Sequence, residues 1–292
     1  MKEKIKTIGC TLLLMVALPY IFTMAFQGKR AEENLQVNER EDLEKYVISV
    51  VAQEIPVHYE IEALKAQAVI ARTNIQSALE KEEQLPELLS QEELLSLWGK
   101  ENFSSNYQQV TEAVQATENI VMRYQGNYIY AAFHAVSAGK TRSASDALHT
   151  EDMPWLQSVE SDADIPSKDY LKVIFLEKAE FAEKISRIFP ETVVELENPL
   201  KNIKIIARDE SEYVQEVKLG EKVVSGEEFR RAMELNSACF YIKEVEDEIR
   251  IVTKGLGHGL GMSQYGANVM ASEGVAYQEI LSYYFKNIEI SD

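Results

Sequence analysis

Cysteine is scarce in this chain of 292 residues, which contains only Cys10 and Cys239. Because Cys10 lies in an uncharged N-terminal run, the remaining chain has a single cysteine and no partner for an internal disulfide. The sequence also lacks C-x-x-C and H-E-x-x-H, the spacings typical of zinc sites. It lacks G-x-G-x-x-G and the full G-x-x-x-x-G-K-[ST] as well, the glycine motifs that bind phosphate. These absences argue against a disulfide scaffold, a common zinc motif and a phosphate loop.

Positive charge is also in short supply, with 30 Lys and Arg against 48 Asp and Glu and a net charge of -18. Residues 1–30 have a net charge of +4, so the rest of the chain carries about -22. Such a field repels nucleic acid and anionic lipid headgroups. We therefore expect no nucleic-acid partner, whereas neutral substrates such as glycans are compatible with this charge.

Residues 7–28 form an uncharged run between Lys2, Lys4 and Lys6 on one side and Lys29 and Arg30 on the other. A run of this length can span a bilayer as a helix. A cleaved signal peptide is the alternative, but Thr23-Met24-Ala25 is a poor cleavage site. The sequence predicts a single-pass anchor in residues 1–30, a cell-membrane location and an extracytoplasmic domain.

The residues after the anchor show no repeat and favour an α+β fold. A polar linker over 31–40 precedes one expected domain, residues 41–292. Hydrophobic periodicity predicts helices first and mostly antiparallel strands later. Helices are expected over 41–53, 61–79, 86–98, 108–118, 176–189, 225–235, 263–271 and 277–285. Strands are expected over 120–124, 127–133, 202–207, 213–219, 238–244 and 248–253. The resulting class is N-terminal helices packed with a β region, preceded by a transmembrane helix.

Glycine occupies every second position from Gly255 to Gly261. In an extended strand, this alternation would leave one face without side chains. Two reasons for it stay open: close packing against another backbone, or room for a flat ligand. In the second case, the stretch leaves a groove that His258 reaches, and Ser263, Gln264 and Tyr265 line it.

Glu54 continues an apolar stripe of residues 47, 50 and 51 at the end of the first predicted helix. Apolar neighbours and a helix C-terminus both favour the protonated carboxylic acid, the form that a general acid requires. The alternative is a frayed helix end with Glu54 in water.

Two further side chains are candidates for a site. Arg72 lies on the apolar stripe of the second helix, where a guanidinium needs a buried anion or a ligand, and Glu54 is one candidate partner. The alternative is an arginine whose head group reaches solvent over the core. His134 ends a predicted strand just before Ser137 and Lys140, where it is either structural or part of a site.

Three blocks of this sequence resemble the stage II sporulation protein D family, which includes the amidase enhancers of cell-wall turnover. The first runs from Tyr46 to Thr73 and contains A-Q-E-I-P and E-A-L-K-A-Q-A-V. The second runs from Phe133 to Val159 and contains S-A-G-K-T. The third is the glycine stretch with S-Q-Y-G-A and the residues up to Tyr284. The blocks occur in the family's order and together span residues 46–284.

The resemblance implies a lytic transglycosylase that cleaves the MurNAc–GlcNAc bond of peptidoglycan and leaves 1,6-anhydro-MurNAc ends. The family's catalytic carboxylate maps onto Glu54. One carboxylate suffices because the sugar's own 6-hydroxyl attacks the anomeric carbon. The substrate-binding residues expected from the motifs are Arg72, His134, Ser137, Lys140, His258, Ser263, Gln264 and Tyr265. In the sporulation members, a partner amidase first strips the glycan, and both act with a third membrane protein during engulfment.

The second block departs from the family pattern. Ala135-Val136 and Ala138-Gly139 stand where the family usually has Ser-Thr and a double glycine. Some members bind zinc here through histidine and cysteine, but this chain has no cysteine in the block, and only Asp146 could replace it beside His134. We therefore predict no cofactor and no metal ligand. The alternative function is a non-catalytic glycan-binding activator of a cell-wall amidase, and a structural membrane scaffold explains the motifs least.

Overall fold

A computed structural model of the protein describes residues 40–292, with side chains from residue 43 onward. The predicted anchor and nearly all of the predicted linker lie outside these residues. Within residues 40–292, no helix combines the length and the apolar character needed to cross a membrane.

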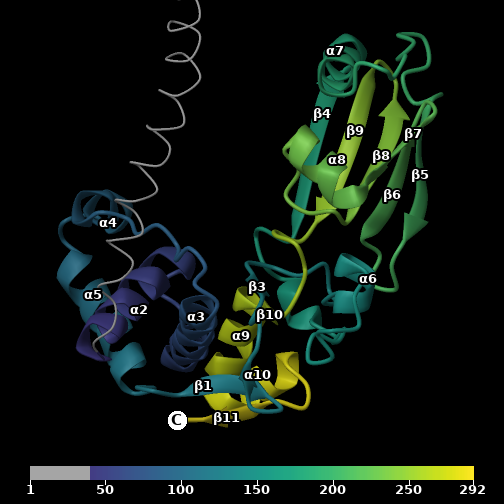
Figure 1. Ribbon diagram of the computed structural model, residues 1–292. Helices are drawn as coiled ribbons and strands as arrows, with labels where there is room; N and C mark the ends of the chain where they lie inside the picture. Colours follow the sequence, from purple (N-terminus) through teal and green to yellow (C-terminus); the bar gives the residue numbers. More distant parts are fainter. Residues whose placement is uncertain (1–39) are drawn as a thin grey trace, which may run out of the picture.

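Four helices form a first lobe, coloured purple to blue in Figure 1. They are α2 (Arg40–Glu54), α3 (Ile61–Glu80), α4 (Gln91–Trp98) and α5 (Phe103–Gln115). Their apolar stripes meet in one core that contains Val47, Val51 and Leu64. Helix α4 begins later than the predicted residue 86, because Ser90 and Glu93 form a capping box that starts the helix at Gln91.

A central layer follows the helical lobe and brings together distant parts of the sequence (Figure 1). The predicted hairpin is β1 (Val121–Tyr124) with β2 (Asn127–Tyr128), and β11 (Glu289–Ser291) pairs with the other edge of β1. The predicted strand over 127–133 is shorter than expected, since β3 (Phe133–His134) leaves the hairpin and pairs in parallel with β10 (Met262–Ser263). The helices of this layer are α6 (Ala144–Leu148), α9 (Gln264–Ser272) and α10 (Tyr277–Tyr284).

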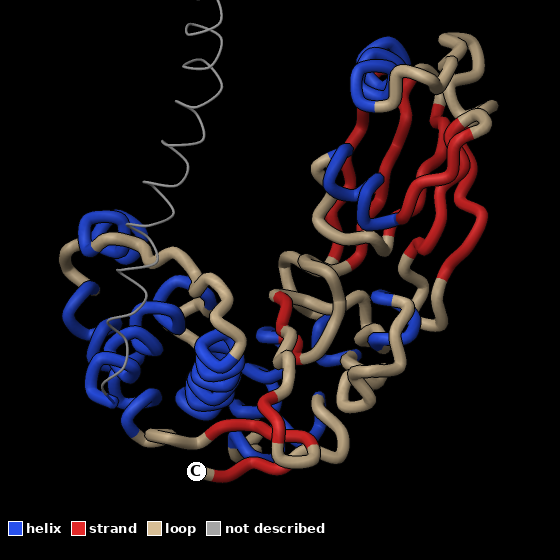
Figure 2. Tube along the Cα trace, viewed as in Figure 1, coloured by secondary structure: helices blue, strands red, loops and turns tan. Residues whose placement is uncertain are grey.

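Strands dominate the second lobe, shown in red at the upper right of Figure 2. One sheet has the order β4 (Leu171–Glu177), β9 (Glu248–Lys254), β8 (Phe240–Val245), and the other has the order β5 (Ile203–Arg208), β6 (Val214–Leu219), β7 (Lys222–Ser225). Helices α7 (Lys178–Ile188) and α8 (Gly226–Met233) share one core with these strands. Strand β4 is a correction, because the sequence pattern assigns no strand to residues 171–175 and predicts a helix from residue 176.

The structure confirms the α+β class, with helices first and antiparallel sheets later. Every strand pair is antiparallel except β3 with β10 among the described residues. The chain runs from the helical lobe through the central layer to the sheet lobe, and returns to the central layer after β9 (Figure 1). The C-terminal motif therefore lies beside the first and second sequence blocks, where the candidate site is found.

Candidate active site

Glu54 is the last residue of α2, and its side chain is exposed. Its carboxylate has no hydrogen bond or ion pair with the described residues, so both oxygens are available to a ligand. The protein around it raises the pKa of Glu54 above its ordinary value, because partial burial disfavours the charged form. A free carboxyl group with a raised pKa suits a proton donor.

An aromatic cluster lies in the turn that follows Glu54. His58 is exposed and packs edge-on against Tyr59, with ring centroids 5.2 Å apart. Tyr59 in turn meets the edge of Tyr265, the second residue of α9, at 6.5 Å. Burial, followed by the nearby Tyr265, Asp169 and Asp164, raises the pKa of Tyr59 to about 12, so its hydroxyl remains a hydrogen-bond donor at neutral pH. Aromatic rings beside a free carboxylate are suited to a sugar ligand.

Ser137 and Ser263 are buried around Asp164 rather than exposed in a groove. The Asp164 carboxylate accepts from the Ser137 backbone N–H at 3.0 Å and from the Ser263 hydroxyl at 2.7 Å. The Ser263 hydroxyl also accepts from the backbone N–H of Gly266 and caps α9. This is a correction, because both serines join the second and third sequence blocks internally and face no groove.

The glycine stretch does not form an extended strand with an open face. Gly255, Gly257, Gly259 and Gly261 all have positive φ, a conformation that other residues rarely adopt. A Cβ on Gly261 would lie 1.9 Å from the Ala132 carbonyl oxygen, and one on Gly257 would lie 2.8 Å from the His134 Cβ. The prediction of open space is therefore wrong, since Gly255, Gly257 and Gly261 let the C-terminal segment pack directly on residues 132–138, and Gly259 packs against the ring of Tyr213.

We expect the Gly261→Ala variant to have a much lower midpoint of urea unfolding than the Gly274→Ala variant. Both glycines have positive φ, so both variants lose about 1 kcal/mol of backbone preference. Only Gly261 lacks room for a methyl group, which adds about 1–3 kcal/mol for overpacking. Urea unfolding of the two variants checks this prediction, and equal losses of stability would contradict the close-packing role of Gly261.

The rings of His134 and His258 lie next to each other with their planes tilted by 57° and their centroids 5.8 Å apart. Nδ1 of His134 donates to the Leu260 carbonyl at 3.0 Å, and Nδ1 of His258 accepts from the Leu260 N–H at 3.0 Å. His134 is buried, and its Nε2 atom has no hydrogen-bond partner among the described residues. Both histidines therefore hold the glycine stretch, and His134 has no surface to offer a ligand in this structure.

Burial, followed by the neighbouring His258, lowers the pKa of His134 from 6.5 to about 3. Between these two values the unfolded chain binds a proton that the folded chain rejects, so stability falls as the pH falls. We expect this residue to reduce the free energy of unfolding by up to about 1.4 kcal/mol per pH unit below about 6.5. Urea unfolding from pH 7 to pH 4 should show a shallower slope for His134→Gln than for the wild type, and parallel slopes would refute the prediction.

Arg72 pairs with Glu44 rather than with Glu54. Its guanidinium donates to both Glu44 carboxylate oxygens, at 2.7 and 2.6 Å, and to the carbonyl oxygens of Val114 and Ile120. The arginine is 1% exposed, so it cannot contact a sugar. This corrects the predicted site role of Arg72. Its side chain lies on the apolar stripe of α3 and links α2 to α5 and to the residue that precedes β1.

Lys140 and Asp146 lie apart from the buried histidines. Lys140 forms an ion pair with Glu160 at 3.6 Å on the surface. The carboxylate of Asp146 accepts from the Ser143 hydroxyl at 2.8 Å, where Ser143 caps α6. In residues 40–292, no three His, Cys, Asp or Glu side chains come close enough to hold a metal ion.

Several residues of the site escaped the sequence analysis. Tyr59 and His58 come shortly after Ile55-Pro56. The sequence shows that they are close to Glu54 in the chain, but it does not predict that their rings pack together. Asp164 lies in a segment for which the sequence predicts neither helix nor strand, and Glu44 lies ten residues before Glu54. Asn268 carries no motif signal of its own. Glu44, Asp164 and Asn268 each have a partner more than 25 positions away, which periodicity cannot reveal.

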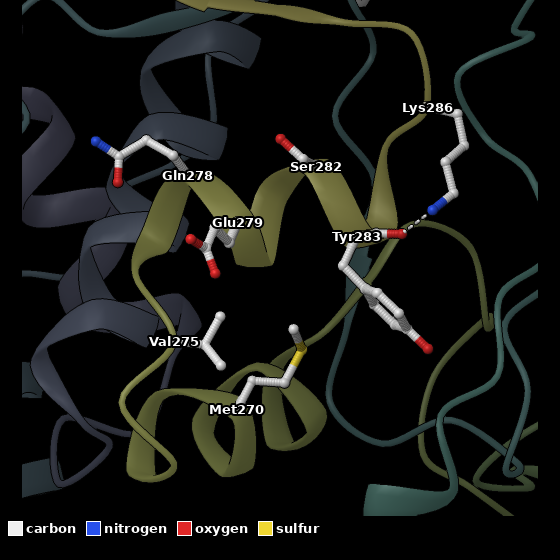
Figure 3. A pocket seen from close by; sticks show the side chains of 7 residues that line it. All are labelled: Met270, Val275, Gln278, Glu279, Ser282, Tyr283 and Lys286. Carbon is white, nitrogen blue, oxygen red and sulfur yellow. Dashed lines mark hydrogen bonds between the residues drawn. The ribbon is translucent and has the colours of Figure 1, made fainter.

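A separate hollow lies between α9 and α10 (Figure 3). Met270 and Val275 provide apolar surface there, and Lys286 donates to the Tyr283 carbonyl at 2.7 Å at its edge. Glu54 is not among the residues that line this hollow. The hollow is therefore distinct from the candidate active site.

Comparison with known proteins shows the family of this chain. Residues 31–124, which include Glu54 and the turn after it, match the family described as stage II sporulation protein. The matched segment thus points to the class of stage II sporulation proteins. Stage II sporulation protein D of Bacillus subtilis is 35% identical over 264 residues, covering 86% of this chain and 74% of that protein. The corresponding protein of Bacillus amyloliquefaciens gives the same values. The chain belongs to the stage II sporulation protein D family.

A more distant relative is named an amidase enhancer. This Bacillus subtilis protein is 25% identical over 283 residues, which cover 81% of this chain and 39% of the enhancer. The similarity extends over most of the described structure, so the two proteins share more than the Glu54 segment.

Proposed function

We propose that this chain is a lytic transglycosylase that cleaves peptide-stripped peptidoglycan during sporulation. The observation that carries the proposal is the exposed carboxyl group of Glu54, which has a raised pKa and no partner among the described residues. Its place at the end of α2, five residues before Tyr59, whose ring packs against that of Tyr265, supports a glycan as the ligand.

The proposed reaction uses one carboxyl group twice. Protonated Glu54 donates its proton to the oxygen of the bond between MurNAc and GlcNAc as that bond breaks. The 6-hydroxyl of the same MurNAc attacks the anomeric carbon, and the Glu54 carboxylate accepts its proton. An intramolecular nucleophile has a very high effective concentration, so no second carboxylate and no water molecule are needed. The products are a GlcNAc end and a 1,6-anhydro-MurNAc end.

The proposal is tested by the products that the protein forms. Residues 31–292 are incubated with glycan strands freed of stem peptides and, in parallel, with intact peptidoglycan. Mass spectrometry should detect 1,6-anhydro ends with the stripped strands and far fewer with the intact wall. Hydrolysed, non-anhydro ends or unchanged strands would contradict the proposed reaction.

A second candidate function rests on the similarity to the amidase enhancer. In that case the chain binds glycan and activates a cell-wall amidase without cutting the strands. Activation that persists in a Glu54→Gln variant, together with unchanged glycan strands, would favour it over the enzyme.

We place the protein at the cell membrane with its described domain outside the cytoplasm. Residues 7–28 would anchor it, and a cell-wall amidase and a membrane scaffold protein of the engulfment complex would be its partners. The high negative charge supports the use of stripped glycan, because removal of acidic stem peptides reduces repulsion.

A further inference from the structure

Two amide side chains on one face of α9 hold the two ends of the turn that follows Glu54. Nε2 of Gln264 donates to the Glu54 carbonyl oxygen at 2.8 Å. Oδ1 of Asn268 accepts from the Glu60 backbone N–H, also at 2.8 Å. Residues 264 and 268 are four apart, so they share one face of the helix. A single helix from the C-terminal motif therefore bridges the first and last residues of the turn over 54–60.

Both held groups lie at helix ends. The Glu54 carbonyl is in the last turn of α2, and Glu60 is the N-cap of α3 with no side-chain cap of its own. Such groups have no partner within their helix and need one from elsewhere. The amides of α9 supply it, so they fix where α2 ends and α3 begins.

The Gln264 amide is itself held in place. It is 4% exposed, and its Nε2 lies 3.2 Å from Oε1 of Gln67, which is fully buried in α3. The Ser263 cap fixes the start of α9 directly before it. Movement of this amide would leave buried polar atoms without hydrogen-bond partners, so the amide is held in one orientation.

We propose that Gln264 and Asn268 are positioning residues that clamp the turn of residues 54–60 and thereby aim the Glu54 carboxyl group. The Glu54 side chain has no partner of its own among the described residues, so its direction depends on the backbone that carries it. The catalytic part of this inference rests on the proposed function. A displacement of about 1 Å in a catalytic group lowers the rate by up to about 100-fold.

The chemistry of the clamp predicts that replacing an amide by the corresponding acid is tolerated at one end and not at the other. Gln264 must donate, so Gln264→Glu removes the bond and places a carboxylate beside a carbonyl oxygen. Asn268 must accept, so Asn268→Asp keeps the bond whereas Asn268→Ala loses it. We expect Gln264→Glu and Asn268→Ala to lower kcat by about 10-fold to 100-fold with KM unchanged. Asn268→Asp should restore kcat to near the wild-type value.

Asn74→Ala is the matched control. Asn74 exchanges two bonds with the backbone of Ala131, each 2.9 Å long, and does not touch the turn. This variant should lose stability in urea unfolding and keep its kcat. An equal fall in kcat for Asn74→Ala, or a wild-type kcat for Gln264→Glu, would overturn the positioning role.

Hydrogen exchange tests the clamp without any need for activity. The backbone amides of residues 55–60 should exchange faster in Gln264→Glu and Asn268→Ala than in the wild type and in Asn268→Asp. Unchanged exchange in all variants overturns the clamp. A wild type that cuts no glycan contradicts the proposed function and the catalytic role of the clamp, while exchange still decides whether the clamp exists.

Discussion

Glu54→Gln is expected to lower the rate of glycan cleavage by about 10²-fold to 10⁴-fold, the usual contribution of a general acid. Glutamine has nearly the same shape and leaves the Gln264 bond intact, because that bond goes to the Glu54 backbone carbonyl. Only the transferable proton is lost. Release of 1,6-anhydro ends from stripped strands, measured over time by mass spectrometry, gives the rates.

Glu80→Gln is the matched control for this substitution. Glu80 is also an exposed glutamate at the end of a helix, the last residue of α3. Its replacement changes the net charge by the same amount and should leave the rate unchanged. Equal rates for wild type and Glu54→Gln would contradict the enzymatic proposal.

The pH profile supplies a second signature of Glu54. A general acid must be protonated in the free enzyme, so kcat/KM should fall as the pH rises through the Glu54 pKa. Because burial raises that pKa, the fall should lie at a higher pH than for an ordinary glutamate. The residual activity of the Glu54→Gln variant should not show this fall in kcat/KM with rising pH.

Glu44→Gln is expected to destabilise the fold by about 3–5 kcal/mol, because it leaves the Arg72 guanidinium buried without its counter-charge. Arg72 is 1% exposed, and Glu44 supplies two of its four bonds. The loss should appear as a lower midpoint of urea unfolding. Replacement of both partners by apolar residues, Arg72→Met with Glu44→Leu, should restore much of the stability.

The exposed pair of Lys201 and Glu195 provides the comparison. Their side chains lie 2.7 Å apart and are 54% and 45% exposed. Water screens this pair, so Glu195→Gln should cost less than about 1 kcal/mol. Similar losses for Glu44→Gln and Glu195→Gln would show that burial of Arg72 does not determine its contribution.

Local patterns predicted the regular elements well. The stripe of α3 follows from nearby residues, and so does the start of α8, where Ser225 caps the helix and accepts from the Glu228 N–H. Strand β4 was missed because Leu171, Val173 and Phe175 are exposed apolar residues, so its sequence lacks the apolar–polar alternation of a half-buried strand. Its place is set by pairing with β9, some 75 residues later in the chain.

In the candidate site, too, features that depend on neighbouring residues could be predicted, whereas features that depend on distant partners could not. Glu54 was proposed as the acid from local features alone, its place after an apolar stripe and at a helix C-terminus, and its catalytic role stays a prediction. The roles of Arg72, Ser137 and Ser263 were not, since each depends on a partner that only folding brings near. The structure assigns these side chains to internal bonds, and it adds Tyr59 and Asn268 to the surroundings of Glu54.

By itself, the sequence determined the α+β class, most helices and strands, the family and the candidate acid Glu54. These follow from periods of two and 3.6 residues and from short motifs, which are properties of neighbouring residues. The tertiary structure decided which polar groups face a ligand and which satisfy one another. An isolated sequence cannot distinguish these cases, because a buried polar group needs a partner and the partner's identity depends on how the whole chain packs.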